Sequence, residues 1–484
     1  MTPSKSSRAR GSAPGVEEIR LAPVSVQRLQ GVAEREGWEA LEAARRECGG
    51  ALLGRTLWMV NSTAVGGGVA EMLRSLVPYA LSMGLDVRWS VVRADPAFFR
   101  VTKRVHNMLH GYPGDGGDLG STARRVYERG LEPAMAWLTG RVRAGDIVVL
   151  HDPQSTGLAP ALAAAGARVV LRSHVGGEHT NVLVRAARDF LGPYAPRADA
   201  VVFTRSTEPP PQVGAVRTAT IHPCIDPCSV KNRPMKETDA RAVLVDAGLV
   251  EADRQSPTGQ GRRHRRLSGR ASAVRRTGHA PRVGVDRLVL HLARWDRLKD
   301  PIGVMEAFTT TVMDVGDARL MLAGPAIHDV ADDPEAGAVY REVEARWHRL
   351  PRAQRDHIDL VRLSMRDRDA NATIVNALQR EASVIVKKSL EEGFGLGVTE
   401  AMWKGRPVVA SRVGGHRDQI EDGVSGVLVD DPRDLAGFGQ AISEVLLDEQ
   451  LAQRLGEAAH ERVQACYLPD RAIAAWLRLL ATLS

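Results

Sequence analysis

Two glutamates eight positions apart, Glu392 and Glu400, are the residues of this chain whose type and spacing point most clearly to chemistry. A strand-like apolar run at 382–386 leads into a glycine-containing turn, and a helix-like segment follows at about 396–404. The free N–H groups and the dipole at the start of such a helix attract an anion. A carboxylate in the helix can accept hydrogen bonds from a vicinal diol, and one in the turn can face a developing positive charge. A diphosphate, a ribose and a reacting sugar would together satisfy these groups.

The turn between the two glutamates is predicted to hold phosphate oxygens through its backbone. Its residues are Gly393, Phe394, Gly395 and Leu396. A glycine turn between a strand and a helix also occurs as a packing feature in doubly wound proteins, so the turn alone leaves that interpretation open. The carboxylates on either side of it favour a binding site.

Short apolar segments alternate with helix-like segments along most of the chain. The strand-like segments are 56–61, 86–92, 147–150, 167–171, 200–203 and 219–221 in the first half, and 288–292, 320–323, 358–361, 382–386, 407–410 and 426–429 in the second. Such alternation is typical of parallel sheets covered by helices. We therefore predict an α/β fold with two Rossmann-like doubly wound domains facing a central cleft, with ligands beyond the carboxyl ends of the strands.

Composition suggests where the domains begin and end. Residues 1–15 are basic, small and polar and are expected to be a disordered tail, whereas 16–50 are predicted to be helical. The expected divisions are an N-terminal Rossmann-like domain at 16–235, a linker at 236–285, a C-terminal Rossmann-like domain at 286–465, and a helix at 466–484 that packs back across the domains.

Basic residues and glycines follow the first strand of each predicted domain. Arg294 and Lys299 come after the strand at 288–292, where a guanidinium could bind a diphosphate bidentately and an ammonium could act as a point charge. Gly67 and Gly68 follow the strand at 56–61 and would let the backbone approach phosphate oxygens. Surface exposure for the basic pair, and a packing turn for the glycines, are the alternatives.

Three more polar residues stand at strand ends in the first half. Asp152 and Gln154 follow the strand at 147–150, and His174 follows the strand at 167–171. A structural turn is the alternative for the first two, and a structural histidine for the third. Their common position at the carboxyl edge of a parallel sheet favours a ligand-binding role.

Composition is that of an ordinary soluble protein, with 44% hydrophobic and 25% charged residues. No apolar run approaches the ~20 residues needed to span a bilayer, and the N-terminus lacks the apolar core of a secretory signal. The four cysteines, Cys48, Cys224, Cys228 and Cys466, are too scattered for a disulfide framework. We expect a cytoplasmic protein.

The net charge of +7 arises largely from one segment, because residues 254–285 contain nine arginines and no acidic residue. An arginine-rich tract can bind nucleic acid. This one has no interleaved aromatic residues to stack on bases. We therefore predict a solvated, disordered insertion and no nucleic-acid partner.

The motifs together resemble those of retaining family 4 glycosyltransferases with two Rossmann domains (the GT-B fold), and most of all the trehalose synthase group. The resemblance covers nearly all of 51–484 except the basic insertion. Its distinctive stretches are residues 60–63, 66–71, 101–103, 106–107, 151–154, 224–227, 294–296, 299–301 and 391–400. The last three mark the broad superfamily, and the others are more specific to the trehalose-synthase-like group.

The resemblance implies transfer of a hexosyl group, glucosyl foremost, from a nucleotide diphosphate sugar to a small sugar, with retention of configuration. Glu392, His174, Arg294 and Lys299 would then be catalytic, Glu400 would hold the ribose, and Gly67 and Gly68 would approach the donor phosphates. Asp152, Gln154 and His174 would bind the acceptor. No Asp-x-Asp metal motif stands in a matching context, so we expect no cofactor and no metal. Relatives often form homodimers.

One departure concerns the acceptor. Residues 175–181, Val-Gly-Gly-Glu-His-Thr-Asn, differ from the acidic and small-polar pattern that usually follows the histidine in trehalose synthases. The acceptor therefore remains open between glucose and a modified sugar or aminocyclitol of secondary metabolism. The base of the donor is equally open. A trehalose phosphorylase, which has the same architecture, is the alternative enzyme.

Overall fold

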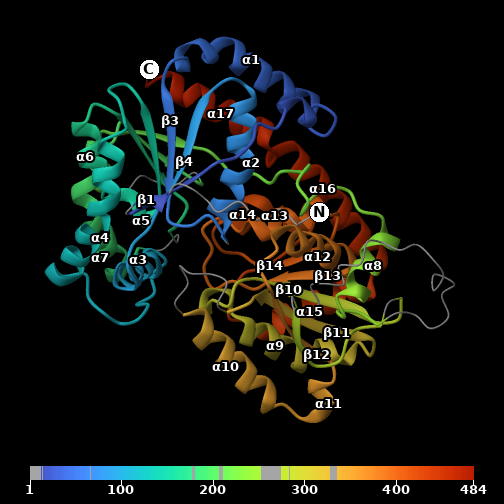
Figure 1. The fold of residues 1–484 in the computed structure, drawn as a ribbon. Coiled ribbons are helices and arrows are strands. Elements are labelled where there is room, and N and C mark those ends of the chain that lie inside the picture. Colours follow the sequence, from blue (N-terminus) through green and yellow to red (C-terminus); the bar gives the residue numbers. More distant parts are fainter. Residues whose placement is uncertain are drawn as a thin grey trace, which may run out of the picture. The chain divides into compact units, whose positions relative to one another are not determined.

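The computed structural model describes residues 12–13, 15–65, 67–176, 180–205, 211–251, 274–282, 284–327 and 335–483. The chain divides into two compact units. Unit 1 comprises Met1–Val26, Leu41–His222 and Ile473–Ser484, and unit 2 comprises Gln27–Ala40 and Pro223–Ala472. Each unit is built around one sheet (Figure 1).

Unit 1 contains a sheet of eight strands in the order β1-β2-β4-β3-β5-β6-β7-β8. Their bounds are β1 Ser12–Ala13, β2 Val16–Ile19, β3 Thr56–Asn61, β4 Asp86–Val92, β5 Ile147–His151, β6 Arg168–Ser173, β7 Ala200–Phe203 and β8 Arg217–Thr220. The strands from β3 to β8 are parallel, and β1 and β2 add an antiparallel edge. Because β4 and β5 lie on opposite sides of β3, the strand order reverses between β3 and β5.

Helices connect these strands and bury their apolar sides on the sheet. They are α2 Gly68–Ser82, α3 Pro96–Leu109, α4 Ser121–Thr139, α5 Pro153–Thr156, α6 Ala159–Ala164 and α7 Val182–Leu191, with 3₁₀ turns at Gly192–Arg197 and Pro211–Val213. Helix α3 begins where Asp95 accepts a hydrogen bond from the Phe98 N–H, with Pro96 at the first position. Phe98 and Tyr127 stack in the core between α3 and α4, with ring centroids 5.7 Å apart.

Unit 2 contains a sheet of seven strands in the order β15-β14-β13-β10-β11-β12-β9. Their bounds are β9 Val274–Thr277, β10 Arg287–Leu292, β11 Ala318–Pro325, β12 Ile358–Leu363, β13 Val384–Lys387, β14 Val408–Ser411 and β15 Val427–Val429. All are parallel except β9, which pairs antiparallel with β12. Without β9, this is the strand order of a dinucleotide-binding Rossmann domain, and it reverses between β10 and β13.

Helices cover both faces of the second sheet. They are α8 Glu237–Asp246, α9 Pro301–Thr310, α10 Ala336–His348, α11 Arg352–Arg355, α12 Arg368–Glu381, α13 Leu396–Trp403, α14 Gly415–Gln419, α15 Leu435–Leu447 and α16 Glu449–Cys466, with 3₁₀ turns η6 Arg297–Lys299 and Val312–Asp314. Two helices belong partly to each unit, α1 Arg35–Leu52 and α17 Pro469–Ala481, and a 3₁₀ turn at Val26–Leu29 precedes α1.

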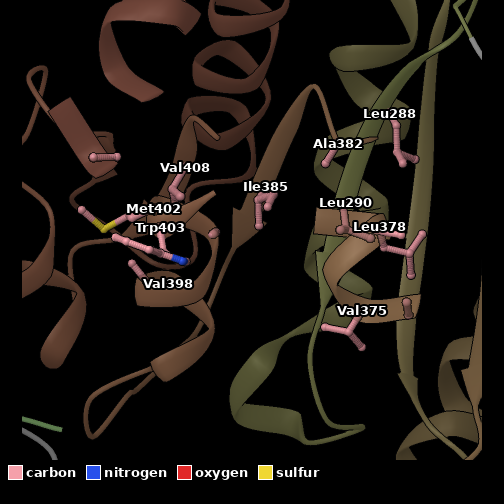
Figure 2. Close-up of a cluster of buried hydrophobic side chains, with 14 of the residues drawn as sticks. Leu288, Leu290, Val375, Leu378, Ala382, Ile385, Val398, Met402, Trp403 and Val408 are labelled. Atoms are coloured by element: carbon pink, nitrogen blue, oxygen red, sulfur yellow. The ribbon is translucent and has the colours of Figure 1, made fainter. Parts of the chain in front are cut away.

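Side chains that alternate along the central strands explain why both faces are covered. Leu288 and Leu290 on β10 point into a cluster with α8, α12, α13 and α16, and Figure 2 shows them beside Leu378 and Ile385. Val289, between them in sequence, packs on the other face against α9, α10 and α15. A strand that is apolar on both sides is typical of a parallel sheet buried between helix layers.

The predicted α/β fold is confirmed, with differences at the edges. Residues 16–19 form a strand and not a helix, because their backbone pairs antiparallel with β4. Residues 12–13, within the range expected to be a disordered tail, pair with β2. Residues 274–277 form β9 within the range expected to be disordered, because β12 offers an unpaired edge there. Residues 254–273 of the arginine-rich insertion, and Val283, lie outside the described residues.

The unit boundaries also differ from the predicted divisions. Residues 27–40 and the expected linker from residue 236 onward cluster with unit 2, where α8 packs on α12. Residues 473–484 cluster with unit 1.

Candidate active site

The loops that follow β10 and β13 meet at the point where the strand order of unit 2 reverses. In doubly wound sheets, ligands bind beyond the carboxyl ends of strands at such a point. The backbone N–H of Leu390 donates to the Leu298 carbonyl over 2.8 Å and ties the two loops together. Trp295, buried after β10, donates its indole N–H to the Pro325 carbonyl over 2.9 Å and anchors the first loop.

Lys299 and Glu392 join the same two loops through their side chains. The Lys299 ammonium donates to Oε2 of Glu392, and Ser389 Oγ donates to the same oxygen over 3.4 Å. Both members of the pair are largely buried, with side-chain exposures of 18% and 15%. The sequence predicted both residues for this site, and the fold brings them together. The pair places a cation and a carboxylate side by side at the switch point.

Arg294 lies near this pair on the loop after β10. Its guanidinium is half-buried, with Nη2 3.6 Å from Oδ2 of Asp296. Asp296 is itself fixed, because it accepts a hydrogen bond from the Leu298 N–H at the start of η6. Arg294 and Lys299 therefore lie on the same short loop after β10, with Lys299 inside the 3₁₀ turn η6.

Helix α13 starts directly beyond the 392–395 turn. Gly395, at φ 89°, is its N-cap residue and has a conformation that side chains other than hydrogen strongly disfavour. Gly414 supports the turn from the neighbouring loop, where an added Cβ would lie 1.6 Å from the Glu392 carbonyl oxygen. Phe394 points into the core against Tyr467, with ring centroids 5.6 Å apart. A ligand at this turn therefore meets the Phe394 backbone and not its ring.

Glu400 is buried in the first turns of α13, beside three lysines. Its Oε1 is 2.7 Å from the Lys231 ammonium, and Gln379 donates to its Oε2 over 3.3 Å. Burial alone would raise the pKa of Glu400, but the charges of Lys231, Lys404 and Lys387 outweigh burial and hold it below its ordinary value. Glu400 is therefore an ionised acceptor, and each of its oxygens has a second lone pair to offer.

In unit 1, the corresponding reversal of strand order lies between β3 and β5. After β3, Asn61 donates to the Thr63 carbonyl over 2.7 Å and accepts from the Trp89 indole over 2.8 Å, which orders the start of the loop. Gly67, at φ 78°, is the N-cap residue of α2, and the exposed Gly68 begins this helix. The two predicted glycines thus stand at a helix N-terminus.

Asp152 and His174 lie together at the ends of β5 and β6. The backbone N–H of His174 donates to Oδ1 of Asp152 over 2.7 Å. Asp152 is half-buried at φ 63° and precedes α5, which carries the half-buried Gln154. Burial raises the pKa of Asp152 to about 7, although the His174 N–H and the charge of Arg172 oppose that rise.

The ring of His151 packs against the ring of His174. The rings stack with centroids 5.3 Å apart, and His151 Nδ1 is 3.0 Å from His174 Nε2. Burial lowers the pKa of His151 to about 3 and that of His174 well below its usual range, with the Arg172 charge acting in the same direction. Both rings are therefore neutral at pH 7, and they share one N–H···N hydrogen bond.

The direction of that bond can be assigned from the buried surroundings. Among the described residues, Nε2 of His151 has no hydrogen-bond partner. If the ring of His174 donated, the proton of His151 would lie on Nε2, and this buried N–H would have no acceptor. If His151 donates from Nδ1, its Nε2 carries only a lone pair without a partner, which costs less free energy. The second arrangement is favoured, and it leaves the proton of His174 on Nδ1.

Both halves of the chain match known protein families. The family model described as "Trehalose synthase, N-terminal domain" matches residues 59–208, and "Glycosyl transferases group 1" matches residues 281–462. A trehalose synthase of Rubrobacter xylanophilus is 34% identical over 446 residues, covering 90% of this chain and 93% of the relative. The chain belongs to the trehalose synthase family of glycosyltransferases.

A solved structure and a second curated relative are also similar to this member of the trehalose synthase family. The solved α,α-trehalose-phosphate synthase (UDP-forming) of Burkholderia xenovorans, in complex with glucose-6-phosphate, superposes with a TM-score of 0.63 at 15% identity, covering 89% of this chain and 100% of that one. It shares the GT-B fold. A trehalose phosphorylase of Pleurotus pulmonarius is 26% identical over 435 residues, which cover 87% of this chain and 56% of that protein.

Sequence reasoning missed several residues that this family member brings to the two sites. Lys231, His416 and His151 each contact a predicted residue, namely Glu400, Glu392 and His174. Lys231 comes shortly after the quoted motif at 224–227, and His416 follows a glycine pair that the sequence marks as a loop. Nothing local indicated what either side chain would contact.

The described part of the chain lacks the features of a metal site and of a membrane-spanning helix. No group of three or more His, Cys, Asp or Glu side chains that could hold a metal ion occurs there. Its cysteines, Cys48, Cys224, Cys228 and Cys466, form no disulfide. No helix within the described ranges has the length and apolar character needed to cross a bilayer. Part of the unusual 175–181 loop, residues 177–179, lies outside the described residues.

Proposed function

We propose that this glycosyltransferase moves a hexosyl group, glucosyl foremost, from a nucleoside diphosphate sugar to a small sugar or sugar-like acceptor, with retention. The observation that carries the proposal is the Lys299–Glu392 pair at the switch point of unit 2. It lies directly before the N-terminus of α13, and Glu400 is buried one turn inside that helix. A phosphate group, a sugar and a ribose need such a cation, helix end and pair of carboxylates.

In this proposal the donor lies along the carboxyl edge of the second sheet. Arg294 and Lys299 bind the diphosphate, and the backbone at 393–396 adds N–H groups from the start of α13. Gly67 and Gly68, at the N-terminus of α2 in unit 1, keep their predicted role as backbone N–H donors to phosphate. Glu400 accepts from the ribose hydroxyls with the lone pairs that Lys231 and Gln379 leave available.

The reaction breaks the bond between the anomeric carbon and the phosphate oxygen, and it forms a bond to the acceptor oxygen on the same face. The acceptor hydroxyl passes its proton to the departing phosphate. Glu392 stabilises the oxocarbenium-like transition state, and Arg294 and Lys299 stabilise the negative charge on the leaving group. These cations and the helix dipole perform the task that a metal ion performs elsewhere, so we propose catalysis without a metal or other cofactor.

The acceptor is bound by residues of unit 1. Asp152 and Gln154 form hydrogen bonds with hydroxyl groups of the acceptor sugar or sugar-like molecule. His174, with its proton on Nδ1, is held by Asp152 through its backbone and by His151 through its ring. The acceptor class is a small polyol ring, either glucose or a modified sugar or cyclitol.

A screen of ADP-, UDP- and GDP-sugars against several acceptors tests the proposal, with the product identified by mass and anomeric configuration. The expected result is release of one nucleoside diphosphate for each glycoside formed, with the donor's anomeric configuration kept. Addition of EDTA should leave the rate unchanged. An inverted product, or no product with any sugar nucleotide, would refute the proposal.

Trehalose phosphorolysis is the second candidate, because relatives of that name match most of this chain. A phosphorylase would bind free phosphate and would have no ribose for Glu400 to hold. Incubation with trehalose and phosphate should therefore give no sugar 1-phosphate. If sugar 1-phosphate forms while no sugar nucleotide reacts, the phosphorylase assignment replaces the first one.

A further inference from the structure

His416 lies beside the catalytic carboxylate, on the short helix α14. Only 1% of the residue is exposed to solvent. Its Nδ1 is 3.1 Å from the carbonyl oxygen of Ser411, at the end of β14. A carbonyl oxygen can only accept, so Nδ1 must carry the ring proton and donate it.

The other ring nitrogen has a lone pair to offer. Burial lowers the pKa of His416 to about 4. The charge of Glu392 opposes this shift, and the charges of Lys299 and Lys387 act in the same direction as burial. The ring is therefore neutral at pH 7, and with the proton on Nδ1 its Nε2 is an acceptor. Nε2 lies 3.7 Å from Oε2 of Glu392, which is too long for a hydrogen bond.

Oε2 of Glu392 already accepts hydrogen bonds from Lys299 and Ser389, so in this gap it is the lone pair on Nε2 of His416 to which the described residues donate no hydrogen bond. Phosphate oxygens would not satisfy this lone pair, because they are acceptors that carry negative charge. Hydroxyl groups would, because each can donate to one acceptor. Gly395 lies directly beside both side chains, since a Cβ added to it would be 3.0 Å from Nε2 of His416 and 3.1 Å from Cγ of Glu392.

We propose that Nε2 of His416 and Oε2 of Glu392 accept hydrogen bonds from neighbouring hydroxyls of the transferred hexose, so that His416 determines which sugar is accepted. This inference rests on the proposed function, because it assumes that a sugar nucleotide occupies this site. It adds a residue and a contact that recognise the sugar ring itself, whereas Arg294, Lys299 and Glu400 recognise the nucleotide.

Two variants separate sugar recognition from a purely structural role. In His416→Asn, the amide can still donate from near the Nδ1 position to the Ser411 carbonyl, but the Nε2 acceptor is lost. In His416→Gln, the amide oxygen can reach the Nε2 position, but the bond to Ser411 is lost. If the ring only holds the turn, the Asn variant will be the more active. If it recognises the sugar, the Gln variant will be.

Titration calorimetry with the nucleoside diphosphate and with the sugar nucleotide measures this directly. We expect His416→Asn to bind the diphosphate as the wild type does and the sugar nucleotide about tenfold or more weakly, as loss of a buried hydrogen bond implies. Equal affinity of wild type and His416→Asn for the sugar nucleotide would refute the inference. An equal loss for both ligands would do so too.

Donors that lack single hydroxyls provide the test that needs no variant to fold. With the wild type, removal of one hexose hydroxyl should cost about tenfold in affinity, and in His416→Gln that same hydroxyl should matter less. If no single hydroxyl matters, the inference fails while the proposed function stands. If the wild type binds no sugar nucleotide at all, the proposed function itself fails.

Discussion

Lys299 and Glu392 form an ion pair between the loops that follow β10 and β13. These strands are neighbours at the centre of the second sheet, where its strand order reverses. Although the two residues are far apart in sequence, the fold holds their charges together with little exposure to water. An electrostatic contact is stronger in such surroundings than on an open surface. The pair is therefore placed to respond to a charged ligand.

Removal of either partner should reduce turnover strongly without unfolding the protein. We expect Lys299→Ala and Glu392→Gln each to lower kcat by more than tenfold, because in the proposed reaction one stabilises the leaving phosphate and the other the developing positive charge. Steady-state kinetics with the active donor, together with thermal unfolding of each variant, measures both effects.

Arg297→Gln provides a matched control for this prediction. Arg297 lies in the same 3₁₀ turn as Lys299, but its guanidinium pairs with Glu342 on α10. Its loss should leave kcat within about twofold, as expected for an exposed ion pair. Full activity in both Lys299→Ala and Glu392→Gln would move the active site elsewhere.

His151 should fix the tautomer of His174. Nitrogen-15 NMR correlation of the ring atoms should find the proton of His174 on Nδ1 and that of His151 on Nδ1, where it bonds to His174 Nε2. His151→Phe keeps a stacked ring but removes the donor, so the His174 signals should shift toward a mixture of tautomers. We expect kcat/KM for the acceptor to fall by about tenfold, because only part of the enzyme then presents the Nδ1 proton of His174 to the acceptor. A proton found on His174 Nε2 in the wild type would contradict the assignment.

Lys231 should stabilise the fold through Glu400. Lys231→Met leaves a buried carboxylate with fewer opposite charges, which should lower the free energy of unfolding by about 1–3 kcal/mol, less than for a fully buried pair because Lys231 is partly exposed. In the double variant with Glu400→Gln, part of that loss should be recovered. Urea unfolding of the double-mutant cycle measures the coupling. Lys236→Met, which changes an exposed lysine nearby, should have almost no effect.

The parts of the site that the sequence predicted are those with local signals. Lys299 and Glu392 follow strands with clear apolar runs, and in a parallel sheet the ends of such strands must meet at one edge. Glu400 lies at helical spacing from a glycine that starts the helix. The side chains that respond to these residues were not predictable, because Lys231 and His416 reach their partners only through the folded loops at 224–233 and 411–416.

The fold was least predictable where pairing overrides local preference. Val16–Ile19 contains two glutamates, which favour helices, yet it forms β2 because its backbone completes an edge against β4. β9 belongs to an arginine-rich segment without a strand pattern and is specified by the free edge of β12. In both cases the backbone supplies the interaction, so the residue types along the segment give little warning.

Asp359 should make the stability of the protein fall as the pH rises. It is fully buried on β12, neither carboxylate oxygen has a hydrogen-bond partner among the described residues, and Arg276 is 4.0 Å away. Burial raises its pKa from 3.8 to about 7. This shift corresponds to a pH-dependent change of at most about 4 kcal/mol in the free energy of unfolding. Because the folded state binds this proton more tightly, that stability is complete below pH 3.8 and is lost as the pH rises through about 7.

Asp359→Asn should therefore match the wild type near pH 4 and exceed it at pH 8 in urea unfolding, whereas the exposed Glu457→Gln should follow the wild type throughout. Parallel curves for wild type and Asp359→Asn between pH 4 and 8 would contradict a protonated Asp359.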